Sequence, residues 1–513
     1  MSRDRRLALD WVVPVVACAA YLAIGLVWLR FVYLSDFFQM VWLADAQRQG
    51  IATAFANGFL GMGYPLALNG LRSLTGNILT SGKIVQALSG GAILAMLPLL
   101  SRHAFGDAKG SRLAQVLLAV DAVFLFAAAG ETPDLLATAF MIGGLAVAAA
   151  YIAQPSARLA FGAGVLVGVG YLVRYHTLLL LPWLMIAMAA LAKERRRTVL
   201  WALAGFALAA SPQLIASGMI QGNPLFNLHI KSVSMGYYGV SSDFVEKTRP
   251  YTLVSVLTKD PAHVFTQYVG FVTRYFTEIG GGLLLLAGAV LARRNEQRGW
   301  SLLALPAMAL TLLLAAKFYT DRAILFQLVV WYVVIGRTLA HLMAAGEAAA
   351  TRLIAVTLAL ALSGSSIVQA GRTWSRFASL ERRNVEITQI LRANRIGSSR
   401  EVFTTHLSYY LADDPGGGPF YPHDTWLLYD PAYARDFPHA YLSDLPSLND
   451  FVKRHRIRFL LLGPLTGELS DTVYQAQRAG TLGPAYRLLK SWGDLWLYEY
   501  VEEGSQSSRS QSS

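Results

Sequence analysis

The sequence predicts a polytopic α-helical membrane protein that ends in a small α/β domain. Of its 513 residues 54% are hydrophobic and only 15% are charged, whereas a soluble domain carries about 25% charged residues. Hydrophobic stretches long enough to cross about 30 Å of hydrocarbon recur over roughly the first 370 residues. Short strand-like runs follow them. This composition excludes an ordinary soluble enzyme, and the single cysteine, Cys18, excludes a disulfide-rich secreted domain.

Eleven hydrophobic stretches are predicted to be transmembrane helices. They cover approximately residues 11–33, 79–100, 113–130, 133–153, 158–173, 176–192, 198–217, 271–292, 300–316, 323–343 and 353–370. The fifth is rich in glycine, which suits close helix contacts in lipid. The first is too long for a signal-peptide core and lacks a cleavage site, so we expect it to remain in the mature protein.

The distribution of charge predicts the orientation in the membrane. If the amino terminus is cytoplasmic, the segments on that side contain most of the net charge of +12, as the positive-inside rule expects. This orientation accounts for the basic composition without nucleic acid as a partner. Membrane lipids are the partners that we expect. We therefore predict a multi-pass membrane protein whose carboxyl-terminal domain is extracytoplasmic.

The hydrophilic segments predict the domain organisation. The expected division is a transmembrane domain over residues 1–370 with outer loops 34–77 and 218–269, an extracytoplasmic α/β domain over 371–503, and a disordered tail over 504–513. The first outer loop begins with an amphipathic helix pattern. In the α/β domain a polar helix is expected around 374–394, strands near 402, 425, 458 and 494, and a further helix over 446–455.

No soluble-enzyme motif accompanies this pattern. Glycine-rich nucleotide fingerprints, HExxH, CxxC and GxSxG are all absent from the sequence, so metalloprotease, redox and serine-hydrolase functions lose their main support. Ionisable residues at the outer ends of the spans remain. Charges at membrane depth are costly, so they are functional candidates by default.

Three acidic residues lie at this outer rim. Asp36 follows the first span in YLSDFF and is placed to act as a general base, although Ser35 and Asp36 also suit the N-cap of the next helix. Glu131 and Asp134 lie in ETPD between the third and fourth spans, where they can bind a cation, a sugar hydroxyl or a catalytic partner. The alternative is that Thr132 caps the following helix and the carboxylates favour its dipole.

Basic residues at the outer rim run against the positive-inside trend. Arg174 and His176 lie on one turn, and Lys317 and Arg322 bracket KFYTDR on another. Arginine suits bidentate contact with a lipid phosphate. The alternative for the second turn is an ion pair with Asp321.

Other polar residues are interpreted as structural. We expect Lys83 to extend its amine to the membrane surface and Asp121 to bond to a neighbouring helix. The histidines of the carboxyl-terminal domain match no zinc template and are interpreted as surface or packing residues. They are His406, His423, His439 and His455.

The order of these segments resembles bacterial members of the GT-C superfamily, the multi-span glycosyltransferases that include protein O-mannosyltransferases and the lipid A aminoarabinose transferase. The resemblance covers nearly the whole chain. It is carried by Asp36, GYPLALNGLRSLTGN at 63–77, ETPD at 131–134, LVRYHTLLLLP at 172–182, SPQLIASGMIQGNPLF at 211–226, the basic turn at 317–322 and LPSLNDFVKRHRIRFLLLG at 445–463.

The resemblance implies transfer of a sugar, with inversion, from a polyprenyl-phosphate carrier to an acceptor hydroxyl of a glycan, lipid or protein in the cell envelope. It also implies a place in the bacterial inner membrane, with the reaction and the carboxyl-terminal domain on the periplasmic face. Asp36 would be the base on the acceptor. Candidates for holding the donor, the acceptor or a metal are Glu131, Asp134, Tyr64 and His176, and those for the carrier phosphate are Arg322, Lys317 and Arg174. Many relatives have a second acid after the first. Phe37 stands there in this chain, so the resemblance is compatible with a divalent metal but requires none.

Two other functions compete with this one. A transporter or lipid flippase would also place charges inside a helical bundle, but such proteins commonly contain inverted repeats, and this sequence shows none. A membrane-anchored scaffold that uses the carboxyl-terminal domain would leave the rim residues scattered.

Overall fold

The fold is described from a computed structural model. The residues described are 3–30, 36–58, 60–191, 195–226, 237, 253–278, 297–315, 324–345, 349–404, 445–463, 482–493 and 495–501. The α-helices are α1 (Arg3–Ala23), α2 (Asp36–Arg48), α3 (Gly63–Thr75), α4 (Ile78–Phe105), α5 (Ser111–Ala119), α6 (Ala122–Ala129), α7 (Asp134–Ala153), α8 (Ala157–Val173), α9 (Leu180–Leu191), α10 (Arg195–Gln221), α12 (Leu253–Thr258), α13 (Pro261–Glu278), α15 (Gln297–Ala315), α16 (Leu325–Ala345), α17 (Ala349–Ala393) and α20 (Leu445–Arg454).

The predicted class, a helical membrane bundle with a small sheet domain, is confirmed. Among the described residues, five helical segments are long and apolar enough to cross a membrane: Asp10–Trp28, Ile78–Phe105, Asp134–Ala153, Arg197–Gln221 and Leu325–Ala344. The bent pair of α5 and α6 makes a sixth if it counts as one span, and three shorter apolar helices accompany them. The predicted stretch at 271–292 lies largely outside the described residues. The count of eleven spans therefore stays a prediction.

The third predicted span is not one straight helix. α5 and α6 meet at an angle of 67°, because the Asp121 side chain caps α6 by accepting a hydrogen bond from the Phe124 amide at 3.0 Å. Tyr332 on α16 donates its hydroxyl to the same carboxylate at 2.9 Å. The prediction that a neighbouring helix satisfies Asp121 is confirmed, whereas the continuous helix over 113–130 was wrong.

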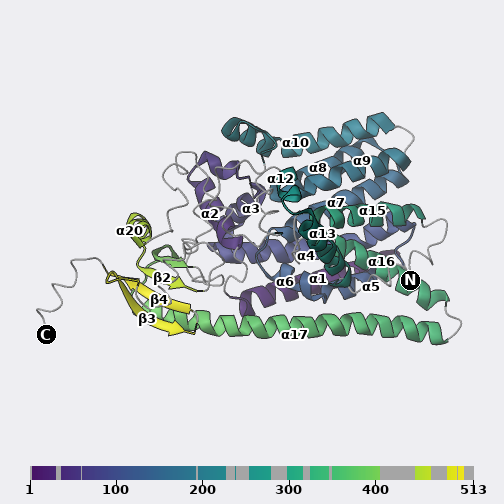
Figure 1. The fold of residues 1–513 in the computed structure, drawn as a ribbon. Helices are drawn as coiled ribbons and strands as arrows, with labels where there is room; N and C mark the ends of the chain where they lie inside the picture. Colours follow the sequence, from purple (N-terminus) through teal and green to yellow (C-terminus); the bar gives the residue numbers. More distant parts are fainter. Residues whose placement is uncertain are drawn as a thin grey trace, which may run out of the picture.

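A second difference concerns the link to the carboxyl-terminal domain. The last predicted span and the polar helix after it form one continuous helix of 45 residues, α17, about 67 Å long at the usual rise. Figure 1 shows that it runs along the whole bundle and ends beneath the sheet. Its apolar and polar halves have different surroundings, yet the helix continues through both.

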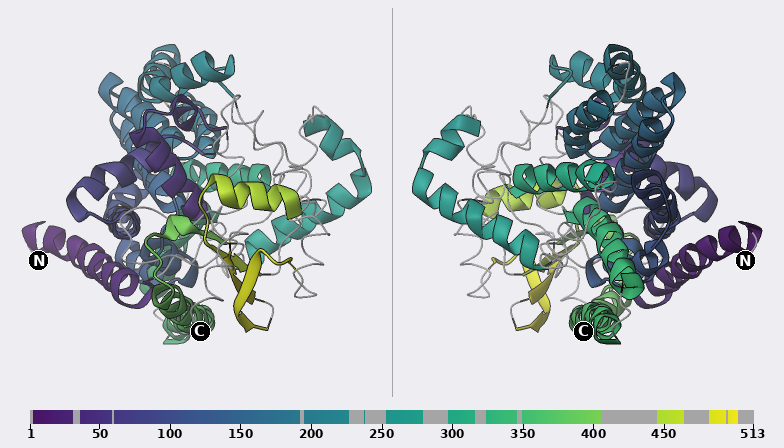
Figure 2. Two further views of the ribbon diagram at one scale, coloured as in Figure 1. Left: turned by 90° about the vertical axis from the view of Figure 1, so that its left-hand side faces the viewer. Right: turned by 90° about the vertical axis from the view of Figure 1, so that its right-hand side faces the viewer.

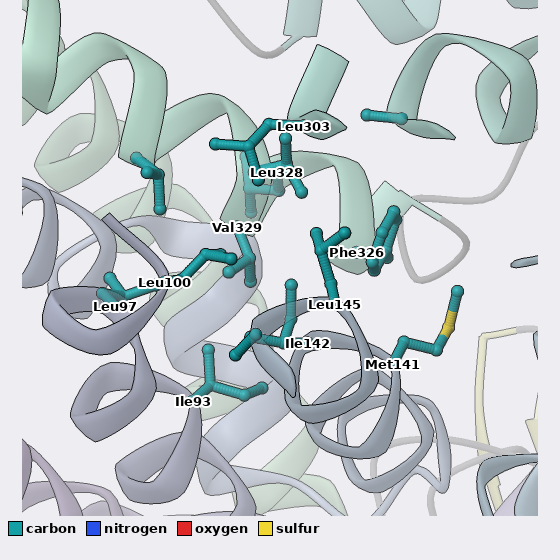
Figure 3. Packing of buried hydrophobic residues seen from close by; sticks show 14 of the residues in the cluster. Ile93, Leu97, Leu100, Met141, Ile142, Leu145, Leu303, Phe326, Leu328 and Val329 are labelled. Atoms are coloured by element: carbon teal, nitrogen blue, oxygen red, sulfur yellow. The ribbon is translucent and has the colours of Figure 1, made fainter. Parts of the chain in front are cut away.

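The core of the bundle lies between α4, α7, α15 and α16. Ile93 and Leu97 of α4 pack against Ile142 of α7 and Val329 of α16 (Figure 3). The glycine-rich α8 crosses α10 so closely that a Cβ atom added to Gly164 would overlap the Ala202 carbonyl oxygen. This is the close helix contact expected for the fifth stretch.

The carboxyl-terminal domain contains a four-stranded sheet of order β1-β2-β4-β3. The strands are β1 (Val402–Thr404), β2 (Phe459–Leu462), β3 (Tyr486–Trp492) and β4 (Leu495–Tyr500). β1 is parallel to β2, and the other pairs are antiparallel. α20 packs on one face through Phe451, and Ile387 and Leu391 of α17 pack on the other.

Three of the four predicted strands, near 402, 458 and 494, are present. The run near 425 lies outside the described residues. β3 was not predicted, because it is an edge strand with mostly exposed residues and lacks the apolar alternation that marks a half-buried strand.

The two ends of the bundle are unlike. The amino terminus lies at one end and the α/β domain at the other, next to α2 and α3 (Figure 1). Seen from the domain end, α20 and the sheet lie in front of the helices (Figure 2). Near the amino terminus, Asp10 forms ion pairs with Arg112 at 3.1 Å and Arg102 at 3.9 Å.

Candidate active site

A buried ion pair occupies the end of the bundle near α2 and α3. Glu131, in the turn between α6 and α7, is fully buried, and its Oε1 lies 3.8 Å from Lys83 Nζ on α4. Lys83 Nζ also donates to the Gly25 carbonyl oxygen at 2.8 Å, in the π-helical turn η1 (Ile24–Trp28). A Cβ atom on Gly25 would come within 2.7 Å of the Ala129 carbonyl oxygen, so glycine permits this approach.

The expectation that Lys83 reaches the membrane surface was wrong. Its side chain is only 2% exposed, because α4 is packed between α1 and α7 at this level and a carboxylate lies opposite the amine. Burying two charges costs several kcal/mol per ion unless they are well paired. A pair maintained at this cost is a strong candidate for function.

Tyr64 fixes the turn that holds Glu131. The side chain on α3 is fully buried, and its hydroxyl donates to the Glu131 carbonyl oxygen at 2.6 Å. Gln86 on α4 donates to the same hydroxyl at 3.1 Å. Burial raises the pKa of the Tyr64 phenol, so Tyr64 stays protonated and acts as a hydrogen-bond donor rather than as a base.

A second ion pair lies at the start of α7. Both carboxylate oxygens of Asp134 contact Arg174, at 3.0 Å from Nε and 3.1 Å from Nη2. Arg174 follows α8 in an extended conformation, and His176 comes two residues later in a 3₁₀ turn, η3 (Tyr175–Leu179), where it is half-buried. Because Nη2 donates to Oδ2 and the charged guanidinium also lies close to Oδ1, Arg174 orients this carboxylate. Its predicted contact with a carrier phosphate stays untested.

The N-cap of α7 lies one residue later than the capping alternative for ETPD expected. Pro133, not Thr132, is the N-cap of α7, and it makes no side-chain cap. Thr132 is buried beside it. Asp134 is the first helical residue, where the helix dipole favours a carboxylate.

The first turn of α2 packs on α4 next to this cluster through Phe37. α2 begins at Asp36, and the ring of the next residue, Phe37, packs on Gly82, whose added Cβ atom would lie 2.8 Å from that ring. Gly82 precedes Lys83, and Tyr64 contacts the same point. The Phe37 ring therefore joins the first turn of α2 to the part of α4 that carries the buried amine, while the side chains of Ser35 and Asp36 lie outside the described part of the chain.

Several predicted residues lie outside the described ranges. Lys317, Asp321 and Arg322 are among them, as are His406, His423 and His439. His455 is described and packs on the Phe451 ring, with 4.5 Å between ring centroids, which agrees with its interpretation as a packing residue. Within the described ranges no group of three His, Cys, Asp or Glu side chains could hold a metal ion.

The cluster thus joins four predicted candidates, Tyr64, Glu131, Asp134 and Arg174, to one residue that was interpreted otherwise, Lys83. Two signals in the sequence pointed to Lys83. It lies only five residues inside a hydrophobic stretch, and acidic residues occupy the turn between two other stretches at the same predicted face.

Comparison with known proteins gives a family match and a fold match. Residues 62–216 match the family model of dolichyl-phosphate-mannose-protein mannosyltransferases. The crystal structure of ArnT from Cupriavidus metallidurans bound to undecaprenyl phosphate superposes with a TM-score of 0.57 and 13% identity, over 98% of this chain and 99% of that one. The apo state of the same protein gives 0.55 and 12% over the same shares. The chain has the GT-C fold.

The resemblance inferred from the sequence is confirmed at the level of this fold. The segment of the GT-C chain that matches the mannosyltransferase family contains all five residues of the cluster. A comparison with the curated proteins gives no match. The apolar helices and the fold together indicate a multi-pass membrane protein.

Proposed function

We propose that this chain is an inverting glycosyltransferase that moves a sugar from a polyprenyl-phosphate carrier to an acceptor hydroxyl. The observation that carries the proposal is the buried cluster of Lys83, Glu131, Asp134 and Arg174 beside the start of α2. The family match over residues 62–216 and the GT-C fold support it.

The chemistry requires two kinds of group on opposite sides of the sugar. As the bond from the anomeric carbon to the phosphate oxygen breaks, negative charge develops on the phosphate, and a nearby cation stabilises it. The acceptor oxygen forms the new bond and loses its proton to a carboxylate. Asp36 is proposed as this base. Arg322 and Lys317 remain proposed phosphate ligands.

Lys83 is a further cation for the leaving phosphate. An ammonium has three N–H donors, and the hydrogen bond to the Gly25 carbonyl oxygen uses one of them. The Glu131 carboxylate lies 3.8 Å from the amine and balances its charge. Glu131 and Asp134, held by Tyr64 and Arg174 respectively, are proposed to bind hydroxyl groups of the donor or acceptor.

The reaction is proposed to occur at the periplasmic face of a bacterial inner membrane. α2, α3 and the α/β domain lie at the end of the bundle opposite the amino terminus (Figure 1). Basic residues gather near the amino terminus, where Arg102 and Arg112 contact Asp10. The positive-inside rule assigns that basic end to the cytoplasm. The acceptor is then a glycan, a lipid or a protein of the cell envelope.

The decisive variant is Asp36→Asn. The full-length protein is reconstituted in liposomes with undecaprenyl-phosphate sugars, including the mannose and aminoarabinose derivatives, and cell-envelope acceptors, and products are identified by mass spectrometry. Loss of a general base lowers turnover by about 10²- to 10⁴-fold, whereas Asp10→Asn at the opposite end changes it little. Wild-type turnover by a folded Asp36→Asn protein would remove Asp36 from the mechanism.

A further inference from the structure

We propose that the α/β domain positions α2 for catalysis through Arg400, so that Asp45 and Arg400 are positioning residues of the transferase. The consequence for turnover rests on the proposed function of Asp36, because α2 begins at that residue. The mechanical link itself rests only on contacts between α2, α3 and the domain.

Asp45 is the point where three elements meet. It lies on α2, nine residues after Asp36, and its Oδ1 accepts a hydrogen bond from Arg72 Nη1 of α3 at 2.7 Å. Its Oδ2 accepts one from Arg400 Nη2 at 2.5 Å. The three side chains are 14%, 11% and 24% exposed. These charge-assisted bonds are thus shielded from water more than ordinary surface pairs.

Trp42 strengthens the same contact. The Arg400 guanidinium lies over the Trp42 ring, 3.7 Å from its centroid, and Trp42 also packs against the apolar cluster of the domain that contains Phe403 and Phe451. Trp42 and Asp45 are three residues apart and therefore share one face of α2. This face of α2 contacts the α/β domain.

Other residues of α2 pack against the membrane bundle. Phe37, Met40, Val41 and Ala44 are fully buried in a cluster with residues of α3, α4 and α7. A helix of 13 residues is about 20 Å long and moves as a unit. A displacement of Asp45 is therefore transmitted to the start of the helix, where Phe37 packs on Gly82.

On the other side of the contact, Arg400 is fixed to the sheet. It lies in the 3₁₀ turn η7 (Ser399–Glu401) directly before β1, and Ser398 and Glu401 close this turn as a capping box. Glu401 also binds Arg458 Nη1 at 2.8 Å, next to the first residue of β2. Arg400 is therefore held in a fixed position relative to the sheet, and its ion pair with Asp45 joins the sheet to α2.

The variants follow from this arrangement. Arg400→Ala removes the link and leaves Asp45 paired with Arg72, so the fold is retained. Arg400→Lys keeps the charge but loses the planar stacking on Trp42. Arg487→Ala is the matched control, because Arg487 pairs with Glu499 inside the same sheet and makes no described contact with α2.

The experiment uses the full-length protein in nanodiscs and three measurements. Turnover is measured with the undecaprenyl-phosphate mannose or aminoarabinose donor that gives product, binding with undecaprenyl phosphate alone, and amide hydrogen exchange on peptides spanning residues 36–48. A misplacement of about 1 Å can cost up to 10²-fold. For Arg400→Ala we expect kcat to fall about 10-fold, the Kd for undecaprenyl phosphate to stay within about twofold, and exchange in α2 to accelerate. Arg400→Lys should lie between this variant and the wild type.

The outcomes separate the two proposals. Unchanged exchange in α2, or unchanged kcat with faster exchange, overturns the positioning role, as does an equal effect of Arg487→Ala. Adding Arg400→Ala to Asp36→Asn should lower residual turnover no further if α2 acts through Asp36. If Asp36→Asn turns over normally, the proposed base is wrong, while faster exchange in α2 with a lower kcat would still support positioning by the domain.

Discussion

At the scale of single residues, the candidate site depends on buried charges that neutralise each other. Lys83 and Glu131 are 2% and 0% exposed, so neither has water to replace a lost partner. Such a pair is weak evidence for stability, because an apolar pair of similar volume is often at least as stable. The pair is better explained by a need for charge at this point.

This explanation predicts a separation of stability from activity. Glu131→Gln leaves the Lys83 ammonium without its carboxylate and is expected to destabilise the protein by about 3–5 kcal/mol. Lys83→Met combined with Glu131→Gln should recover most of that loss in thermal unfolding in detergent. The double variant should nevertheless stay at least about 10²-fold below wild-type turnover. If it regains turnover together with stability, the pair is structural.

The sequence identified most of this site but not its connections. Glu131, Asp134 and Arg174 were predicted from the rarity of charge at the outer rim. Lys83 was assigned to the membrane surface, because a lysine near the end of a span usually extends there. Only the packing of η1 and the 131–134 turn around α4 shows that the amine is enclosed, and no local pattern records that packing.

At the scale of elements, apolar segments were predicted well and their breaks and joins were not. Within a single apolar run α5 ends at Ala119 and Asp121 caps α6, and α17 continues where the sequence turns polar. A carboxylate that caps a helix inside an apolar run leaves the apolar pattern of the sequence unchanged. A polar segment that can stay helical ends the apolar pattern without ending the helix. Helix continuity depends on local backbone hydrogen bonds and caps rather than on how apolar the segment is.

The contact of α20 with the sheet is expected to depend on pH through His455. This residue follows α20 and stacks on Phe451, and burial, with Arg454 nearby, lowers its pKa to about 4. An unfolded histidine has a pKa near 6.5, so the unfolded state binds more protons between these values. The stabilisation is complete above about pH 6.5 and is lost as the pH falls toward 4.

The test is hydrogen exchange of the α20 and β2 amides in the full-length protein between pH 7 and pH 4.5, corrected for intrinsic rates. Protection should fall with pH in the wild type and change much less in His455→Phe, which keeps an aromatic ring against Phe451. Equal pH dependence in both proteins would assign the effect to other groups of the domain.

At the scale of the whole molecule, composition and segment order were sufficient to predict a helical bundle with a terminal α/β domain. The way the two parts meet was not predicted. Arg400 and Asp45 are 355 residues apart in the chain, and a surface-compatible arginine and aspartate carry no sign of their partner. Long-range contacts of this kind depend on the packing of α2, α3 and α17. The hydrophobic periodicity of a sequence does not show which elements pack together.

The same arrangement predicts the sidedness of the protein, and the single native cysteine makes the prediction easy to test. In a Cys18→Ala background, Lys490→Cys places a thiol on the exposed edge strand β3, and Lys109→Cys places one in the exposed turn between α4 and α5. β3 lies at the domain end and α5 near the amino-terminal end (Figure 1).

A membrane-impermeant maleimide applied to intact spheroplasts should label Lys490→Cys and leave Lys109→Cys unlabelled, and both should react after permeabilisation. The reason is electrostatic, because the arginines paired with Asp10 lie at the end that contains residue 109, and segments rich in arginine and lysine stay in the cytoplasm. Labelling of Lys109→Cys alone would reverse the orientation and move the proposed transfer reaction to the cytoplasmic face. Release of a cytoplasmic enzyme into the medium is the control for leaky spheroplasts, in which both cysteines would be labelled before permeabilisation.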